Sequence, residues 1–209
     1  MIRQFAINLI LIVGITHWGP LSSPAWATDS PDSVVSGFQE VLIEVMKVAS
    51  ESTVRERFDQ LAPAVDAAFH MRLMTQIAIG SYWKKTGDKD RKTIIDAFRG
   101  MSISTLATLF DGYNGEVFEH QMNTPGPSET ILVKTELIKS DKSRIEIAYV
   151  TKKFGREWRI IDVVVAGGIS ELMVRRSEYR TVLKKEGIKG LIGLLNGKSK
   201  QLMSELNTN

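Results

Sequence analysis

The chain has 209 residues and a formal net charge of +3, from 27 lysines and arginines against 24 aspartates and glutamates. So small a positive excess argues against a nucleic-acid-binding protein, and no stripe of basic residues interleaved with aromatic ones occurs. Cysteine is absent, which excludes a disulfide framework and thiol chemistry and leaves stability to the packing of the core.

The first 27 residues have the pattern of a secretory signal peptide. Arg3 precedes an apolar run over residues 5–15, and Ala25-Trp26-Ala27 matches an A-x-A cleavage site. The apolar run is shorter than the roughly 18 residues that a membrane span needs. We therefore expect cleavage after Ala27 and a mature chain, residues 28–209, that forms a single domain. Export without cysteine favours a bacterial periplasm.

Apolar residues recur every three to four positions in the first half of the chain, which predicts helices. Thr53 and Glu56 have the spacing of a capping box at a helix start. Pro63 interrupts that helix and begins a short new one. The expected helices cover about residues 31–50, 53–63, a restart from 63, 71–83 and 88–110, then 170–186 and 188–206 on either side of Gly187.

After Gly112 the period changes to two, which predicts strands at residues 116–123, 131–138, 144–151 and 157–165. Short connections between them favour antiparallel pairing. Apolar side chains occupy one face of the middle pair and charged ones the other, so helices must cover the apolar face. The fold class is therefore α+β, a curved antiparallel sheet of about four strands with helices packed on one face.

Asp162 is the carboxylate that best fits a catalytic role, because alternation along its strand puts it on the same face as Trp158. A strand aspartate in a hollow interior acts as a general base in ketosteroid isomerases. The other interpretation is a structural carboxylate held by Tyr149, Arg176 or backbone donors. A proton-transfer site generally needs a second positioned group, so we favour the structural role.

The remaining chemistry-bearing residues predict neither a metal site nor a cofactor. His70 and His120 have no partner at metal-ligand spacing, and we expect His120 to be an interior histidine on the inward face of the first strand. No nucleophile elbow, phosphate-binding loop or zinc-protease motif occurs. Arg176, Arg180 and Lys184 follow a helical spacing, which fits a solvated face or a contact surface for anionic head groups.

A family resemblance is carried by the segment from Tyr149 to Tyr179 and by shorter motifs upstream. The chain resembles the MlaC-like, or toluene-tolerance, family of periplasmic lipid shuttles. The motifs that carry it are Phe58-Asp59, Ile79-Gly80-Ser81-Tyr82-Trp83, Tyr113-Asn114-Gly115-Glu116-Val117, Tyr149, Gly155 with Trp158, Asp162-Val163, Gly168-Ile169-Ser170 and Arg176-Ser177-Glu178-Tyr179.

The resemblance implies a carrier, not an enzyme, in which sheet and helices enclose an apolar cavity for a membrane lipid. The family moves phospholipid across the periplasm between inner and outer membranes as part of an ABC-type transport system. Its implied partners are an inner-membrane transport complex, an outer-membrane lipoprotein and, transiently, membrane surfaces. Residues 167–172 resemble a branch associated with hopanoid biosynthesis, so a hopanoid or other isoprenoid lipid is the alternative ligand. An enzyme of small-lipid metabolism that uses Asp162 is a further alternative.

The pocket is expected between the inner face of the sheet and the long helix that ends near residue 110. The residues expected to line it are Phe98, Leu106, Tyr113, Val133, Ile147, Tyr149 and Trp158.

Overall fold

The computed structural model describes residues 29–165 and 167–205, so the expected signal peptide lies outside the described residues. None of the helices in these two ranges combines the length and the apolar character that crossing a membrane requires. The helices are α1 (Pro31–Lys47), α2 (Val54–Ala68), α3 (Met71–Ile79), α4 (Tyr82–Lys85), α5 (Asp88–Leu109) and α6 (Glu171–Glu205), with 3-10 turns η1 (Ala49–Glu51) and η2 (Pro127–Glu129).

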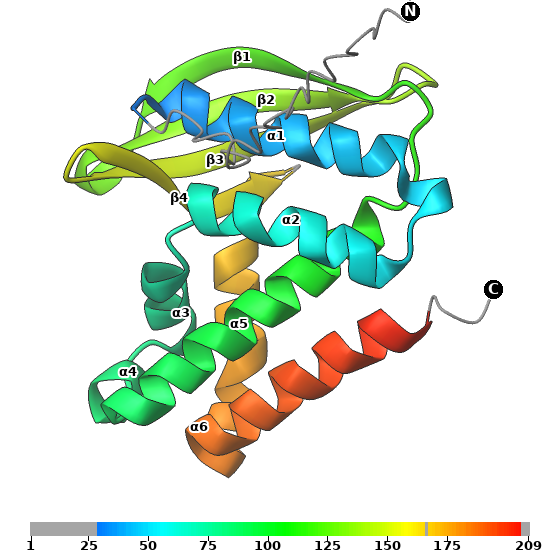
Figure 1. Cartoon of the computed structure of the whole chain (residues 1–209). Coiled ribbons are helices and arrows are strands. Elements are labelled where there is room, and N and C mark those ends of the chain that lie inside the picture. The colour runs from blue at the N-terminus through cyan, green and yellow to red at the C-terminus, as the bar shows by residue number, and fades with distance from the viewer. Residues whose placement is uncertain (1–28, 166, 206–209) are drawn as a thin grey trace, which may run out of the picture.

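A five-stranded antiparallel sheet lies over the helices (Figure 1). Its strands follow chain order and are β1 (Val117–Pro125), β2 (Thr130–Ile138), β3 (Arg144–Phe154), β4 (Glu157–Val165) and β5 (Ile169–Ser170). Helix α1 packs against β2, β3 and β4, and α2, α3 and α6 also reach β4. The expected α+β class, with helices on one face of the sheet, is confirmed. Strand β5 was not predicted.

A bulge in β4 changes which side chains face the helices. Val150 pairs with Asp162, whereas Thr151 pairs with Ile160, so Ile161 is an extra residue between them. Because side chains alternate along a strand, the extra residue puts Asp162 on the face opposite to Ile160. The expectation that Asp162 shares a face with Trp158 is therefore wrong.

A second bulge, between His120 and Met122, bends the edge strand β1. His120 is not interior as expected, because its side chain is half exposed and lies beside α1. Its Nε2 is 3.0 Å from the Asp32 carboxylate, and the Asn123 amide donates to the same carboxylate at 2.8 Å and 3.0 Å. These contacts join the first turn of α1 to the strand.

Two predicted helix boundaries differ from the structure. Helix α2 runs through Pro63 without a break, because Leu61, Ala64 and Val65 around it are fully buried and their packing keeps the turn helical. The helix expected over residues 71–83 is divided at Gly80, which has φ +57°. The Arg176 guanidinium lies 3.0 Å from the place where a Cβ of residue 80 would be, and it donates to the Ile77 carbonyl at 3.1 Å.

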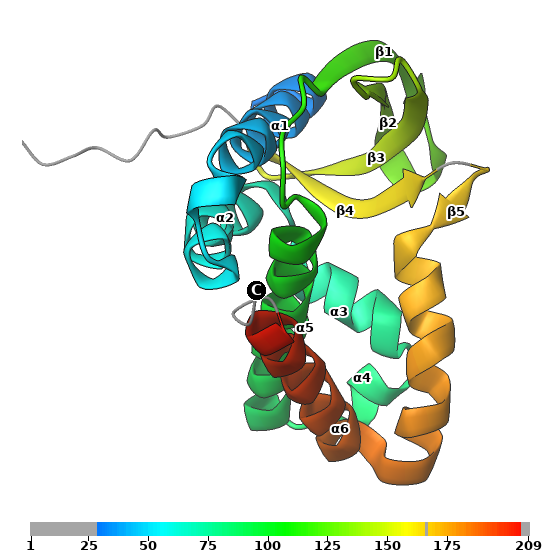
Figure 2. The same ribbon diagram turned by 90° about the vertical axis from the view of Figure 1, so that its right-hand side faces the viewer.

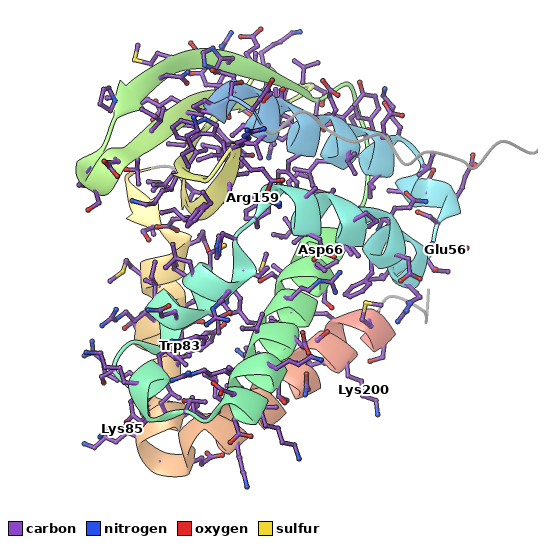
Figure 3. The ribbon with its side chains drawn as sticks, turned by 60° about the vertical axis from the view of Figure 1, so that its left-hand side comes forward. Glu56, Asp66, Trp83, Lys85, Arg159 and Lys200 are labelled. Atoms are coloured by element: carbon purple, nitrogen blue, oxygen red, sulfur yellow. The ribbon has the colours of Figure 1, made fainter. Side chains whose placement is uncertain are left out.

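Arginines tie the sheet and α5 to the end of α2, where Asp66 and Arg159 are labelled in Figure 3. Arg99 of α5 donates two hydrogen bonds to the Asp66 carboxylate, at 2.5 Å and 2.7 Å. Arg159 of β4 donates to the backbone carbonyls of Asp66 and Ala67. These bonds fix the sheet relative to the helices that lie under it.

Helix α6 consists of two halves that meet at Gly187, as predicted (Figure 2). Gly187 has φ +65° and ψ −162°, a conformation that only glycine adopts without strain. The second half turns back beside α5, where the hydroxyls of Ser104 and Ser199 lie 2.7 Å apart.

Replacing Gly187 tests how far the reversal of α6 depends on glycine. Gly187→Ala is expected to lower the free energy of unfolding by about 1–3 kcal/mol through backbone strain, since a Cβ there meets no atom within 4 Å. Gly193→Ala is the control, because residue 193 is helical and equally open. The control should be neutral or stabilising by about 0.5–1 kcal/mol. Urea unfolding measures both variants. Equal effects of the two changes would contradict the requirement for glycine at residue 187.

Candidate functional site

A cavity of about 310 Å³ lies between the inner face of the sheet, α5 and the first half of α6. Its volume is at the lower end of the roughly 300–1,000 Å³ found for small-molecule pockets. The sheet contributes Ile147, Tyr149, Val163 and Val165. Helix α5 contributes a continuous wall from Phe98 to Leu109, and the remaining apolar lining comes from α1, α2, α3 and α6.

Three aromatic side chains form the inner end of the cavity. The rings of Phe38 and Phe69 meet edge to face, with centroids 4.8 Å apart, and Phe38 meets Tyr149 in the same way at 6.4 Å. All three side chains are buried. Such edge-to-face contacts hold the rings in fixed orientations, so this end of the cavity is a rigid apolar surface.

Tyr149 also belongs to a buried polar network under β2 and β3. The Gln39 amide donates to the Thr135 hydroxyl at 3.0 Å, and that hydroxyl donates to the Ile147 carbonyl at 3.2 Å. Burial raises the pKa of Tyr149 to about 12, although a hydrogen bond with Gln39 partly offsets this effect. The phenol therefore remains neutral at physiological pH.

The polar lining residues come from α5, α6 and the sheet, and they are Ser102, Thr105, Glu171, Arg175, Tyr179, Tyr149 of β3 and Asp162 of β4. Ser102 and Thr105 of α5 line the cavity, and their hydroxyls donate to the carbonyls one turn earlier, at 2.8 Å and 2.9 Å. Glu171 and Arg175 of α6 are half-buried at the cavity. Leu109 at the end of α5 is 69% exposed and also lines the cavity, which places the opening beside it.

The residues expected in the pocket divide into two groups. Phe98, Leu106, Ile147 and Tyr149 line the cavity. Val133, Trp158 and Tyr113 do not line it and lie elsewhere in the fold.

Each of these three has a different environment. Val133 is packed in the core beside its cross-strand partner Tyr149. Trp158 is half-buried at the start of β4, whereas the cavity lies under the end of that strand. Tyr113 lies on the surface beside α1, with the Lys47 ammonium 5.9 Å from its ring centre.

Residues of α6 and the methionines Met71, Met74 and Met101 are lining residues that were not expected. Leu172 and Tyr179 were recognisable as the apolar side of an amphipathic helix, but their spacing does not say what that side covers. Of the basic stripe on this helix, Arg180 and Lys184 are exposed, whereas Arg176 is half-buried and bonded to the end of α3.

The Asp162 carboxylate fixes the start of α6. The Ser170 hydroxyl donates to Oδ2 at 2.5 Å, and the backbone N–H groups of Leu172 and Val163 donate to Oδ1 at 3.1 Å and 2.8 Å. The Ser170 oxygen in turn accepts from the Met173 N–H at 3.0 Å. An anionic acceptor stabilises the positive end of the helix dipole. The carboxylate is held by backbone and hydroxyl donors, which fits the structural interpretation.

Nowhere in the described residues do three histidine, aspartate or glutamate side chains come together so that they could hold a metal ion.

Comparison with known proteins identifies a family and similar solved structures. The family model described as "MlaC protein" matches residues 38–197. The structure is similar to that of a phospholipid-binding protein from Ralstonia solanacearum, which was solved in complex with a phospholipid. The TM-score is 0.71 at 17% sequence identity, and the match covers 86% of this chain and 99% of that one. At 17% sequence identity the structural match shows only that the two proteins share a fold. The family match is independent of it and extends over most of the chain.

The capping role of Asp162 can be tested by Asp162→Asn. The asparagine side chain keeps one acceptor oxygen but loses the negative charge. Its NH₂ group is a donor, and it would face one of the N–H or O–H donors that bond to the Asp162 carboxylate. The free energy of unfolding should fall by about 1–2 kcal/mol. Asp59→Asn, which removes an exposed carboxylate 3.0 Å from Arg55, is the control and should change it by less than about 0.5 kcal/mol. Equal stability of Asp162→Asn and wild type would exclude the capping role.

The raised pKa of Tyr149 predicts a loss of stability at alkaline pH. The folded state holds the phenolic proton more tightly than the unfolded state, whose pKa is near 10.0. The contribution of the neutral phenol is therefore complete below pH 10 and is lost as the pH rises towards about 12. The ultraviolet titration curve of Tyr149→Phe is subtracted from that of wild type, and the difference should show the ionisation of Tyr149 with a midpoint near pH 12. A midpoint near 10 would contradict the burial of this hydroxyl.

Proposed function

The chain belongs to the MlaC family, and we propose that it is a lipid carrier whose cavity encloses the apolar tails of a membrane lipid. The observation that supports this most directly is an apolar cavity bounded by the sheet, α5 and α6 in a chain of this family. The phospholipid complex of the similar Ralstonia protein supports a phospholipid as the ligand.

The physical need for such a carrier follows from the hydrophobic effect. Each methylene exposed to water costs about 0.8 kcal/mol, so one long acyl chain costs on the order of 10 kcal/mol. That cost makes the unaided passage of a lipid through an aqueous compartment slow. An apolar cavity removes most of it by replacing water with side chains such as Phe98 and Ile147.

A carrier of this kind works between two membranes. We place it in the periplasm, with residues 1–27 as a signal peptide and residues 28–209 as a single lipid-binding domain. It moves phospholipid between inner and outer membranes as part of an ABC-type system, with an inner-membrane complex and an outer-membrane lipoprotein as partners. These assignments rest on the family and on the sequence pattern of the first 27 residues.

Exposed apolar residues near the cavity support brief contact with a membrane surface during transfer. Ile169 and Met173 are each about half exposed, and Ile169 pairs with the cavity-lining Val165. A lipid tail that enters along this edge stays in contact with apolar side chains, which lowers the cost of its exposure to water.

A hopanoid or other isoprenoid lipid is the second candidate ligand, because residues 167–172 resemble the hopanoid-associated branch. Gly167 and Gly168 have φ near +80° and form an exposed turn before β5. The two glycines are therefore explained by the backbone conformation of a tight turn. They do not contact a ligand in the cavity, so they do not distinguish one lipid from another. An enzymatic role is not proposed, because the family is one of lipid-binding carriers and Asp162 is committed to the cap of α6.

Native mass spectrometry of the exported protein, followed by lipid extraction, tests the function. The mass should equal residues 28–209 plus one phospholipid. Ile147→Lys puts a charge on the cavity wall, where water can reach it once the cavity is empty, so the variant should fold and carry no lipid. Ala148→Lys is the control, because residue 148 lies on the outer face of the same strand, where its cross-strand partners are Lys134 and Val164. It should keep its lipid.

Two outcomes would contradict the proposal. Wild type that never carries lipid would refute the carrier function. Lipid retained in full by a folded Ile147→Lys variant would place the binding site away from this cavity.

A further inference from the structure

Three polar residues of α6 lie at the cavity in one row, while the rest of that wall is apolar. Glu171, Arg175 and Tyr179 all line the cavity and are four residues apart. Four residues of helix advance about 6 Å, so the three residues form a ladder along the first half of α6. This is the half of the helix that follows β5 in Figure 2. An apolar tail needs none of these groups, so the function proposed above leaves them without a role.

Arg175 has hydrogen-bonding capacity that the protein does not use. Its guanidinium has five N–H donors, and in the described chain its bonded partner is Glu178, at 3.2 Å from one terminal nitrogen. The side chain is 29% exposed. Its neighbour Arg176 donates to the Ile77 carbonyl, and the buried Arg57 donates to the carbonyls of Ala49, Ser52 and Ala107. Arg175 differs from both because only its bond to Glu178 is formed among the described residues, and its other donors remain available at the edge of a cavity.

Tyr179 is the second unused group. Its side chain is buried, and its ring meets that of Phe98 edge to face at 6.5 Å. Within residues 29–165 and 167–205 no group hydrogen-bonds to its hydroxyl, and the residue lines the cavity. Burial raises the pKa of this phenol to about 12, whereas nearby Arg175 acts to lower it. The phenol is thus a neutral donor close to the guanidinium.

We propose that this ladder is a head-group subsite, in which Arg175 and Tyr179 bind the phosphate of a lipid and Glu171 binds a positively charged amine attached to it. The ligand class is a zwitterionic, amine-bearing phospholipid. This inference rests on the proposed function, since it assumes that the cavity holds the lipid tails.

The chemistry of each group fits one part of such a head group. A guanidinium binds phosphate oxygens with two parallel hydrogen bonds, and a phenol adds a third donor without adding charge. Glu171 is one helical turn from Arg175, a spacing comparable to the separation of phosphate and amine in an ethanolamine ester. A head group without an amine would leave the Glu171 carboxylate without a cationic partner, one helical turn from the negatively charged phosphate.

The position of the ladder at the cavity edge fits the same ligand. Arg175 and Glu171 are half-buried, so a polar head can keep part of its hydration while its tails extend towards Phe38 and Phe69. A neutral isoprenoid lipid offers no charge to either side chain. The ladder therefore also distinguishes between the two ligand candidates.

A competition experiment tests the subsite. Delipidated protein is mixed with micelles that contain equal amounts of phosphatidylethanolamine, phosphatidylglycerol and diacylglycerol with identical acyl chains, and native mass spectrometry measures the bound fraction of each. Wild type should prefer phosphatidylethanolamine to phosphatidylglycerol, and both to diacylglycerol. Arg175→Gln should reduce the preference for phospholipid over diacylglycerol about tenfold, Tyr179→Phe should reduce it less, and Glu171→Gln should abolish the preference for the amine.

Matched controls separate the subsite from general effects of charge and folding. Arg180→Gln and Glu186→Gln remove equal charges from exposed positions of the same half of α6 and should leave all preferences unchanged. Glu171→Asp keeps the charge and should restore the preference for the amine in part. Thermal unfolding of every variant shows that the protein remains folded.

The outcomes distinguish this inference from the function on which it rests. Wild type that binds the three lipids in the ratio of the mixture is a carrier without a head-group subsite, and the inference fails alone. Wild type that binds none of them is no phospholipid carrier, and both fail. Equal loss of preference in Arg175→Gln and Arg180→Gln would assign the effect to overall charge and overturn the subsite.

Discussion

The attachment of α6 to the sheet through Asp162 is the interaction on which the cavity depends. Strand β4 ends at the cavity, the chain reverses through β5, and the first half of α6 then contributes one wall of the enclosed space. Without a fixed start, the apolar side of this helix would gain most by moving inwards and filling the space. The bonds from Ser170 and Leu172 to the Asp162 carboxylate fix the first turn of the helix in place. They form between the helix cap and the strand, so they do not require a ligand in the cavity.

The same principle applies at the other contacts of α6. Arg176 joins its second turn to the end of α3, Gly187 reverses its direction, and the Ser104–Ser199 contact brings its second half against α5. Each of these is a polar or backbone constraint located outside the cavity. Protein interiors normally close around voids because side chains gain contacts by doing so. Here the walls are fixed at their ends, so the space between them persists in a well-packed protein.

How much of this was predictable from the sequence depended on whether the signal was local. The capping box of Thr53 and Glu56, the break at Gly187 and the four long strands follow from short-range patterns, and the structure has them. The bulge in β4 was not predictable, because Ile160 and Ile161 are both apolar and neither residue indicates where alternation shifts. That shift moved Asp162 to the opposite face. In the site, strand and α5 positions such as Ile147 and Leu106 followed from periodicity, whereas the α6 wall needed the tertiary arrangement.

The charged residues of α6 show why a helical pattern alone does not separate a site from a solvated face. Arg175, Arg176 and Arg180 lie within six positions of one helix, and a sequence reading groups them as one basic surface. In the structure one lines the cavity, one is bonded to α3 and one is exposed. A rotation of about 100° separates Arg175 from Arg176, whereas Arg180 lies one turn after Arg176 on nearly the same side of the helix. The environment of each arginine therefore depends both on the rotation of the helix relative to the sheet and on its position along the helix, and the cap at Asp162 fixes the start of both.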